Sequence, residues 1–166
     1  MIVIPKLDIA FAGPPRTATS TVLQVFSDIT GDDIDVTDPQ KWDFYDMPGY
    51  KIVVTVRDPA TRLWSLYKNY CINEQKVSLH KFLVRRRRLL WYYSLNQCDY
   101  FRKLHRVDVY LRVERLKHDL ESLLGQVVNV PHLYDIRSLE PAPSRDYLAH
   151  FVAPDYVRLA DMWLYS

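Results

Sequence analysis

An arginine followed by a run of hydroxyl residues is the first feature of this chain that could do chemistry. It lies in 9-IAFAGPPRTATSTVLQVF-26, where an apolar run leads through a turn into an apolar segment with helical spacing. A strand, a turn and a helix in this order present backbone amides and the positive end of a helix dipole to an anion. Arg16 starts the turn, but the Gly-Lys pair of a nucleotide triphosphatase is missing. The segment therefore predicts a phosphate-binding loop that works without that lysine.

A second candidate anion site follows the clearest strand of the sequence. The run 51-KIVVTV-56 is β-branched and apolar, which is typical of a strand buried on both faces, and 57-RDPATRLWSLYKNY-70 follows it. An arginine that leaves a parallel strand lies at the carboxyl edge of the sheet, where α/β proteins bind ligands. Ser65 comes about two helical turns later, so the spacing predicts that Arg57 and Ser65 converge on a second phosphate.

Together, PRTATST at 15–21 and VRDPATRLWSLY at 56–67 resemble the two signatures of the sulfotransferases that use 3′-phosphoadenosine 5′-phosphosulfate (PAPS). Those signatures are P-[KR]-[ST]-[GA]-[ST]-[ST] and V-R-[DN]-P-x-x-R-x-x-S-x-Y, each after a strand. The segments 97-QCDYF-101, 109-VYLRVERLKHDLESLL-124 and 155-DYVRLADMW-163 look like the glycan-modifying, Golgi-type branch of that family. The resemblance covers about residues 7–163, but the chain is short and lacks the family's R-K-G-x-x-G-x-W motif.

The resemblance implies a set of donor-binding residues. The phosphosulfate loop would consist of Arg16, Thr17, Ala18, Thr19, Ser20 and Thr21, and the 3′-phosphate would bind Arg57 and Ser65. PAPS would be the donor, adenosine 3′,5′-bisphosphate the product, and no metal would be needed. Because a guanidinium stays charged at neutral pH, Arg16 would stabilise charge on the leaving phosphate and the sulfuryl oxygens rather than donate a proton.

A hydroxyl acceptor also needs a base to take its proton. In the family this is a His or Glu after the strand that follows the loop helix, but no histidine precedes His80 here. The carboxylates at that place lie in 32-DDIDVTDP-39, and Asp38 is favoured, with Asp35 second and His80 a distant third. Aspartates of this kind also occur as solvated turn or capping residues, so that alternative stays open.

The chemistry needs a scaffold, and the sequence predicts one. Strands are expected at 7–12, 33–36, 51–56 and 107–112. A first helix is expected to carry the apolar residues Val22, Val25, Phe26 and Ile29, and further helices are expected at about 60–70, 78–104, 116–125 and 146–164. A hydroxyl among Thr19, Ser20 and Thr21 is expected to cap the first helix, and Gly31 to end it. The predicted fold is one α/β domain over residues 1–166, a P-loop-like three-layer sandwich with a mainly parallel sheet of about four to five strands.

Composition narrows the partners. The 166 residues are 48% hydrophobic and 25% charged with a net charge of +2, which is ordinary for a globular protein and makes nucleic acid an unlikely partner. Two cysteines, Cys71 and Cys98, are too few for a disulfide framework or a zinc site. Neither a signal peptide nor a membrane span is predicted, which favours a cytoplasmic protein of a microbe or a virus-infected host.

The acceptor and two rival functions stay open. The resemblance favours a hydroxyl on a carbohydrate, and 85-RRRR-88 could form a basic rim for an anionic glycan, a solvated helix face or a nucleic-acid or membrane patch. Trp91, Tyr92 and Tyr93 could stack on a sugar or belong to the core. Arg112 and Glu114 are expected to be structural. The rivals are a non-catalytic nucleotide-binding protein of the same fold and a nucleotide kinase-like phosphoryl transferase.

Overall fold

The fold is given by a computed structural model of the chain. It describes residues 1–34, 47–73, 78–83, 97, 101, 104, 106–131 and 143–153. The chain divides into two compact units, Met1–Arg57 with Arg102–Asp135 and Asp58–Phe101 with Ile136–Ser166. Each unit has a hydrophobic core of its own. The organisation of residues 1–166 as a single domain stays a prediction.

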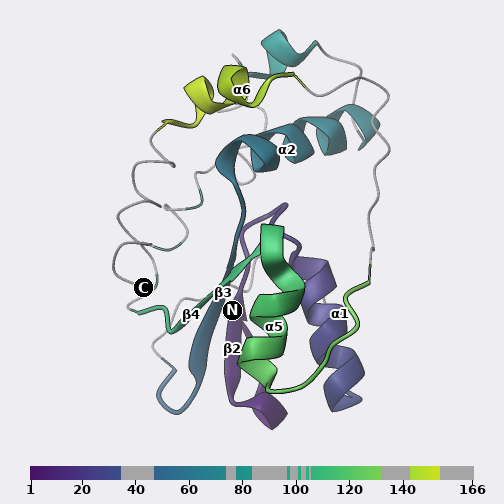
Figure 1. Ribbon diagram of the computed structural model, residues 1–166, viewed down its shortest axis with the longest axis vertical. Helices are drawn as coiled ribbons and strands as arrows, with labels where there is room; N and C mark the ends of the chain where they lie inside the picture. Colours follow the sequence, from purple (N-terminus) through teal and green to yellow (C-terminus); the bar gives the residue numbers. More distant parts are fainter. Residues whose placement is uncertain are drawn as a thin grey trace. The chain divides into compact units, whose positions relative to one another are not determined.

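The first unit is built on a sheet of four strands in the order β1-β2-β3-β4, counted among the described residues (Figure 1). The strands are β1 (Ile2–Ile4), β2 (Ile9–Ala12), β3 (Lys51–Val56) and β4 (Val109–Arg112). β2, β3 and β4 are parallel, whereas β1 folds back through a 3-10 turn, η1 (Pro5–Leu7), and pairs antiparallel with β2. The expectation of a mainly parallel sheet was therefore wrong, because the sheet is mixed.

Two helices of the first unit, α1 (Thr19–Thr30) and α5 (Leu116–Leu124), pack against one face of the sheet. Side chains alternate along a strand, so Phe11 on β2 and Val53 on β3, which pair in register, point to this face. Phe11 meets Phe26 of α1 edge to face, with 5.8 Å between the ring centroids. Residues of the opposite face, such as Ile52 and Val54, are buried as well. The described α/β arrangement, a mixed sheet flanked by helices, is compatible with a three-layer sandwich.

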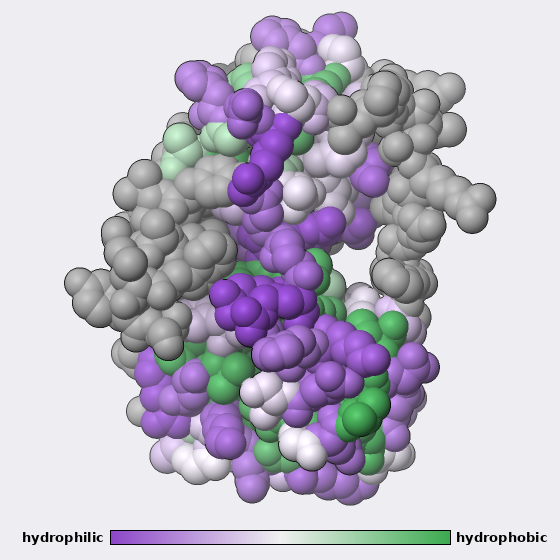
Figure 2. Space-filling view, viewed as in Figure 1, coloured by the Kyte–Doolittle hydropathy of each residue, from purple (hydrophilic) through white to green (hydrophobic). Residues whose placement is uncertain are grey.

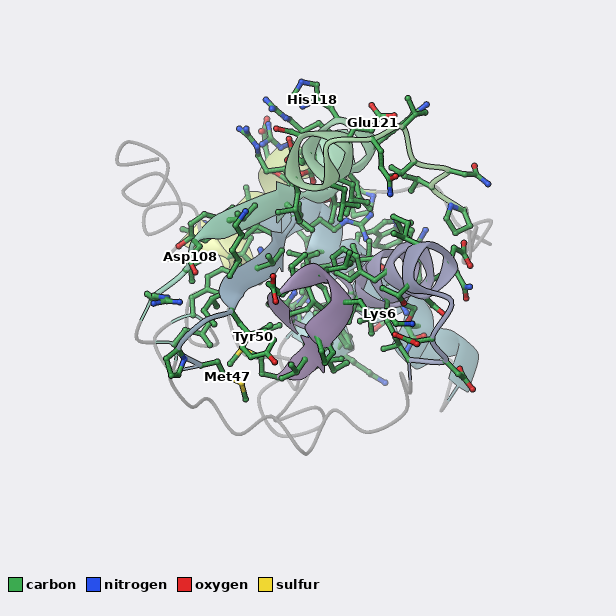
Figure 3. All side chains as sticks on the ribbon, turned by 90° about the horizontal axis from the view of Figure 1, so that it is seen from below. Lys6, Met47, Tyr50, Asp108, His118 and Glu121 are labelled. Carbon is green, nitrogen blue, oxygen red and sulfur yellow. The ribbon has the colours of Figure 1, made fainter. Side chains whose placement is uncertain are left out.

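The polar sides of these helices face solvent. Figure 2 shows hydrophilic side chains over the outer side of α5, where Lys117 and His118 are exposed. At the end of the sheet where the parallel strands begin, Lys6 (labelled in Figure 3) donates to the Thr30 carbonyl at 2.8 Å and pairs with Asp32. Asp108, also labelled there, accepts from the Ile52 amide at 2.7 Å. These contacts lie at the end of the sheet where β2 and β3 begin. The predicted loop, which follows β2, lies at the opposite end.

The second unit contains α2 (Pro59–Asn73) and α6 (Arg145–Phe151). Its core joins Leu63 and Tyr67 of α2 to Phe82 and to Leu148 of α6. The ion pair of Arg145 with Asp58, at 2.7 Å, adds a polar link between the two helices. No helix among the described residues is long and apolar enough to cross a membrane.

Most predicted elements are confirmed where the structure describes them. The strand at 51–56 is β3, and those at 7–12 and 107–112 are trimmed at their starts to β2 and β4. The helix at 60–70 is extended to α2, and those at 78–104 and 146–164 are helical at 79–83, 97, 101, 145–151 and 153. Asp33 and Ile34 have no strand structure, and the rest of 33–36 lies outside the described residues.

Candidate functional site

The predicted phosphate loop is a tight turn between β2 and α1, formed by residues 13–18. Two of its residues have left-handed backbone conformations although neither is glycine: φ is +68° at Arg16 and +58° at Ala18. Such a conformation costs an L-residue about 1–2 kcal/mol, because its Cβ approaches the following carbonyl. Strain of this kind persists where surrounding contacts impose it, and it is concentrated at functional sites.

Hydroxyl groups inside the turn provide those contacts. The Thr17 hydroxyl donates to the Pro14 carbonyl at 2.5 Å and lies 2.7 Å from the hydroxyl of Thr55 on β3. Thr17 and Thr55 are both completely buried. The side chain of Thr17 thus acts within the loop, and its assignment as a donor-binding residue stays a prediction.

Gly13 allows the turn to close tightly. A Cβ at this position would lie 2.6 Å from the Thr55 hydroxyl oxygen and would also clash with that of Thr19. The Thr19 hydroxyl instead lies 3.3 Å from the carbonyl oxygens of both Gly13 and Pro14, as a long, shared hydrogen bond. The loop therefore needs glycine here for the close approach of these two side chains.

The first turn of α1 presents its amides without a side-chain cap. The N-cap residue is Ala18, whose carbonyl accepts from the Val22 amide at 3.0 Å, and no side chain caps this end. The expected hydroxyl cap was therefore wrong, because the Thr19 hydroxyl turns back to the loop carbonyls. The amides of Thr19, Ser20 and Thr21 have no acceptor within the helix and carry the positive end of its dipole. The helix end ahead of the Gly31 cap (φ +70°) is as predicted.

Arg57 is brought to this loop from a distant part of the sequence. It directly follows β3, and because β2 and β3 are parallel neighbours their carboxyl ends lie at the same edge of the sheet. Its guanidinium donates to the Arg16 carbonyl at 3.3 Å, across 41 positions of sequence. Two arginines from the two signatures therefore meet in the first unit, where they can place positive charge beside the amides of α1.

The other predicted site residues fall elsewhere. Ser65 lies in α2 of the second unit and is buried, and its convergence with Arg57 stays a prediction. Asp35 and Asp38, the candidate bases, lie outside the described residues, as do 85–88 and 91–93. His80 is exposed in the helical segment 79–83.

One buried carboxylate was not singled out from the sequence. Asp119 of α5 is 8% exposed and accepts from the Arg112 amide at 2.9 Å and from Arg115 Nε at 2.7 Å. Burial raises the pKa of this carboxyl, but the hydrogen bonds from Arg112 and Arg115 and the charge of Arg115 outweigh it, so that the pKa lies below its ordinary value. Asp119 thereby ties α5 to the end of β4, and the i,i+4 spacing of Arg115 and Asp119 is the signal that could have found it.

Comparison of the chain with protein-family models, with curated proteins and with solved structures gave no match. Among the described residues, no three His, Cys, Asp or Glu side chains gather as a metal site would require. The site must therefore be judged on its own geometry, which is a strained loop, a helix N-terminus and two arginines.

Proposed function

We propose that this protein is a sulfotransferase that moves a sulfuryl group from PAPS to an acceptor hydroxyl, with a carbohydrate as the first candidate acceptor. One observation carries the proposal. Arg57, from the second signature, donates to the carbonyl of Arg16, from the first, so the two segments that resemble the family come together at one sheet edge. The proposal includes a P-loop-like fold, which the parallel pairing of β2 and β3 and the β2–turn–α1 connection support.

The loop suits an anionic, phosphate-bearing donor. The amides at the start of α1 favour a negative group, and close backbone approach is aided by the small Ala18. Arg16 would stabilise the charge that develops as the sulfur–oxygen bond to the phosphate breaks, because its guanidinium is a permanent and forked cation. Arg57 would bind the 3′-phosphate, and Ser65 would share that role as the resemblance implies.

The acceptor side of the reaction rests on the sequence. The acceptor oxygen would form the new bond to sulfur, and its proton would pass to a carboxylate, for which Asp38 is the first candidate and Asp35 the second. Adenosine 3′,5′-bisphosphate would then leave. The loop contains no lysine at the place where a nucleotide kinase carries one, which counts against phosphoryl transfer.

Calorimetry with the purified chain tests the donor. We expect adenosine 3′,5′-bisphosphate to bind more tightly than ATP; equal or tighter binding of ATP would refute the sulfotransferase function. Transfer of labelled sulfuryl from PAPS to a panel of glycans and small alcohols then separates an enzyme from a protein that only binds the nucleotide.

Arg57→Ala tests the second signature. Loss of a hydrogen bond to a charged group costs about 1.5–3 kcal/mol, so affinity for adenosine 3′,5′-bisphosphate should fall by about 10- to 150-fold. Because Arg57 also contacts the Arg16 carbonyl, adenosine 5′-monophosphate should lose affinity too, but less. Equal losses would disprove the 3′-phosphate role. Arg106→Ala is the matched control, since this exposed arginine donates to the Tyr50 carbonyl near the start of β3 and should leave both affinities unchanged.

A further inference from the structure

A chain of hydroxyl groups runs beneath the loop. The Thr17 hydroxyl has a single proton, and the Pro14 carbonyl, 2.5 Å away, can only accept it. In the contact of 2.7 Å between the two hydroxyls, Thr55 must therefore donate and Thr17 must accept. The order of bonds is thus Thr55 to Thr17 to Pro14, and hydrogen bonds in such a chain polarise and strengthen each other.

Thr55 is the only polar residue in the buried run of β3, which reads Ile-Val-Val-Thr-Val from residue 52 to 56. A valine has nearly the same shape and would avoid the cost of burying a hydroxyl. Packing of the sheet alone therefore does not call for threonine at this position. Thr55 differs from a valine in its hydroxyl, which donates a hydrogen bond to Thr17. Thr17 is the loop residue that lies between the two left-handed residues Arg16 and Ala18.

From this we infer that Thr55 is a positioning residue for the anion-binding loop: its hydroxyl sets the place of Thr17 and, through it, the left-handed turn that carries Arg16 and the first amides of α1. This inference rests on the proposed function and deepens it, because Thr55 belongs to neither of the two signatures that suggested the function. Thr55 is completely buried, so its hydroxyl would act on the nucleotide through Thr17.

The geometry gives the size of the effect. In Thr55→Val a methyl group replaces the hydroxyl that lies 2.7 Å from Thr17. A carbon and an oxygen without a hydrogen bond pack at about 3.5 Å, so Thr17 must move by roughly 0.5–1 Å. Displacements of this order in a preorganised site are costly. We expect affinity for adenosine 3′,5′-bisphosphate to fall about tenfold, which is the loss of about 1.4 kcal/mol.

The experiment is calorimetric titration of the full chain with adenosine 3′,5′-bisphosphate, with thermal denaturation measured on each variant. Thr55→Val should bind about tenfold more weakly, whereas Thr55→Ser, which keeps the hydroxyl, should bind within about twofold of the parent chain. Thr30→Val is the matched control. It removes a hydroxyl that donates to the Phe26 carbonyl near the other end of α1, so it should lower thermal stability without changing nucleotide affinity.

The outcomes separate the inference from the function. If the parent chain does not bind the nucleotide, both are overturned. If it binds but Thr55→Val binds equally well, or Thr55→Ser binds as weakly as Thr55→Val, only the positioning role is overturned. Where Thr55→Val folds, the double variant Thr17→Val/Thr55→Val should bind no more weakly than the weaker of the two single variants, because the two hydroxyls act as one unit; additive losses would contradict the inference. Where Thr55→Val does not fold, Thr17→Val removes the same pair of hydrogen bonds from the loop side and should itself bind about tenfold more weakly; unchanged binding would contradict the inference.

Discussion

Replacement of Gly13 by alanine tests whether the loop closes as tightly as the structure has it. The added Cβ would lie 2.6 Å from the Thr55 hydroxyl oxygen and closer still to that of Thr19. Neither side chain can yield easily, because threonine is stiff at χ1 and Thr55 is completely buried. The loop or the end of β3 must shift instead.

Overpacking of a buried position costs about 1–3 kcal/mol. With two contacts under 3.0 Å and a third, to Phe11 Cζ, at 3.1 Å, we expect a loss at the upper end of that range, about 2–3 kcal/mol. For a chain of this length this corresponds to a fall in Tm of roughly 4–12 °C. Urea unfolding followed by circular dichroism measures the free energy, and thermal denaturation gives the Tm.

Two comparisons show whether the clash is the cause. In Gly125→Ala the new Cβ meets no atom within 4 Å, so only the left-handed backbone (φ +67°) is penalised and the loss should be about 1 kcal/mol. Thr19→Ala removes the nearest clashing oxygen, so the double variant with Gly13→Ala should be more stable by about 1 kcal/mol than the sum of the single losses predicts. Additive losses, or a loss at Gly13 no larger than at Gly125, would refute the close approach.

Two further predictions concern Asp119 and Arg16. The pKa of Asp119 is lowered in the folded chain, so its contribution to stability is present above its unfolded value of about 4 and is lost as pH falls through the folded pKa. Asp119→Asn should therefore lower the free energy of unfolding by about 2 kcal/mol at pH 7, a difference that shrinks below about pH 4 in urea titrations; a constant difference would contradict the role of the charge. Arg16→Gly and Arg16→Ala should both lose sulfuryl transfer. The free energy of unfolding of the glycine variant, measured by urea titration, should be higher than that of the alanine variant by about 1 kcal/mol, because only alanine keeps a Cβ at φ +68°. Equal stability of the pair would show that the left-handed conformation is not strained.

The sequence predicts those parts of the fold that depend on local patterns. β3 was predicted at its full length because the run 51-KIVVTV-56 is short and rich in β-branched residues, which favours a buried strand over a helix, and because Arg57-Asp58-Pro59 ends it. The C-terminal end of α1 was found because Gly31 supplies the left-handed cap there. α5 was found from its apolar spacing, since Leu116 and Leu120 fall on one face.

The parts that were missed depend on contacts that no local pattern records. β1 has only three residues, and the sequence of Ile2–Ile4 does not indicate that this strand pairs antiparallel with β2. That pairing is what makes the sheet mixed. The hydroxyls of Thr17 and Thr19 looked like ligand donors or caps because both uses need the same side chain. Their bonds to carbonyls of the loop follow from the turn itself, which no residue spacing determines. In the sequence, Thr55 is one more β-branched residue of a strand. Its contact with Thr17 exists only in the folded chain, where β2 and β3 are paired.

The hydroxyl contacts within the turn bear on how the loop can work. Because the side-chain hydroxyl of Thr17 is used within the turn, the charge complementarity of the proposed site would come from the first amides of α1, which the turn holds in place, and from the guanidinium groups of Arg16 and Arg57. Such groups lower a reaction barrier most when they need not reorganise as charge develops. A turn held by a buried hydroxyl chain, by the Arg57 contact to the Arg16 carbonyl and by a glycine with no room for a Cβ meets that condition before any donor binds. The strain at Arg16 and Ala18 would then be the cost of presenting the first amides of α1 at this sheet edge.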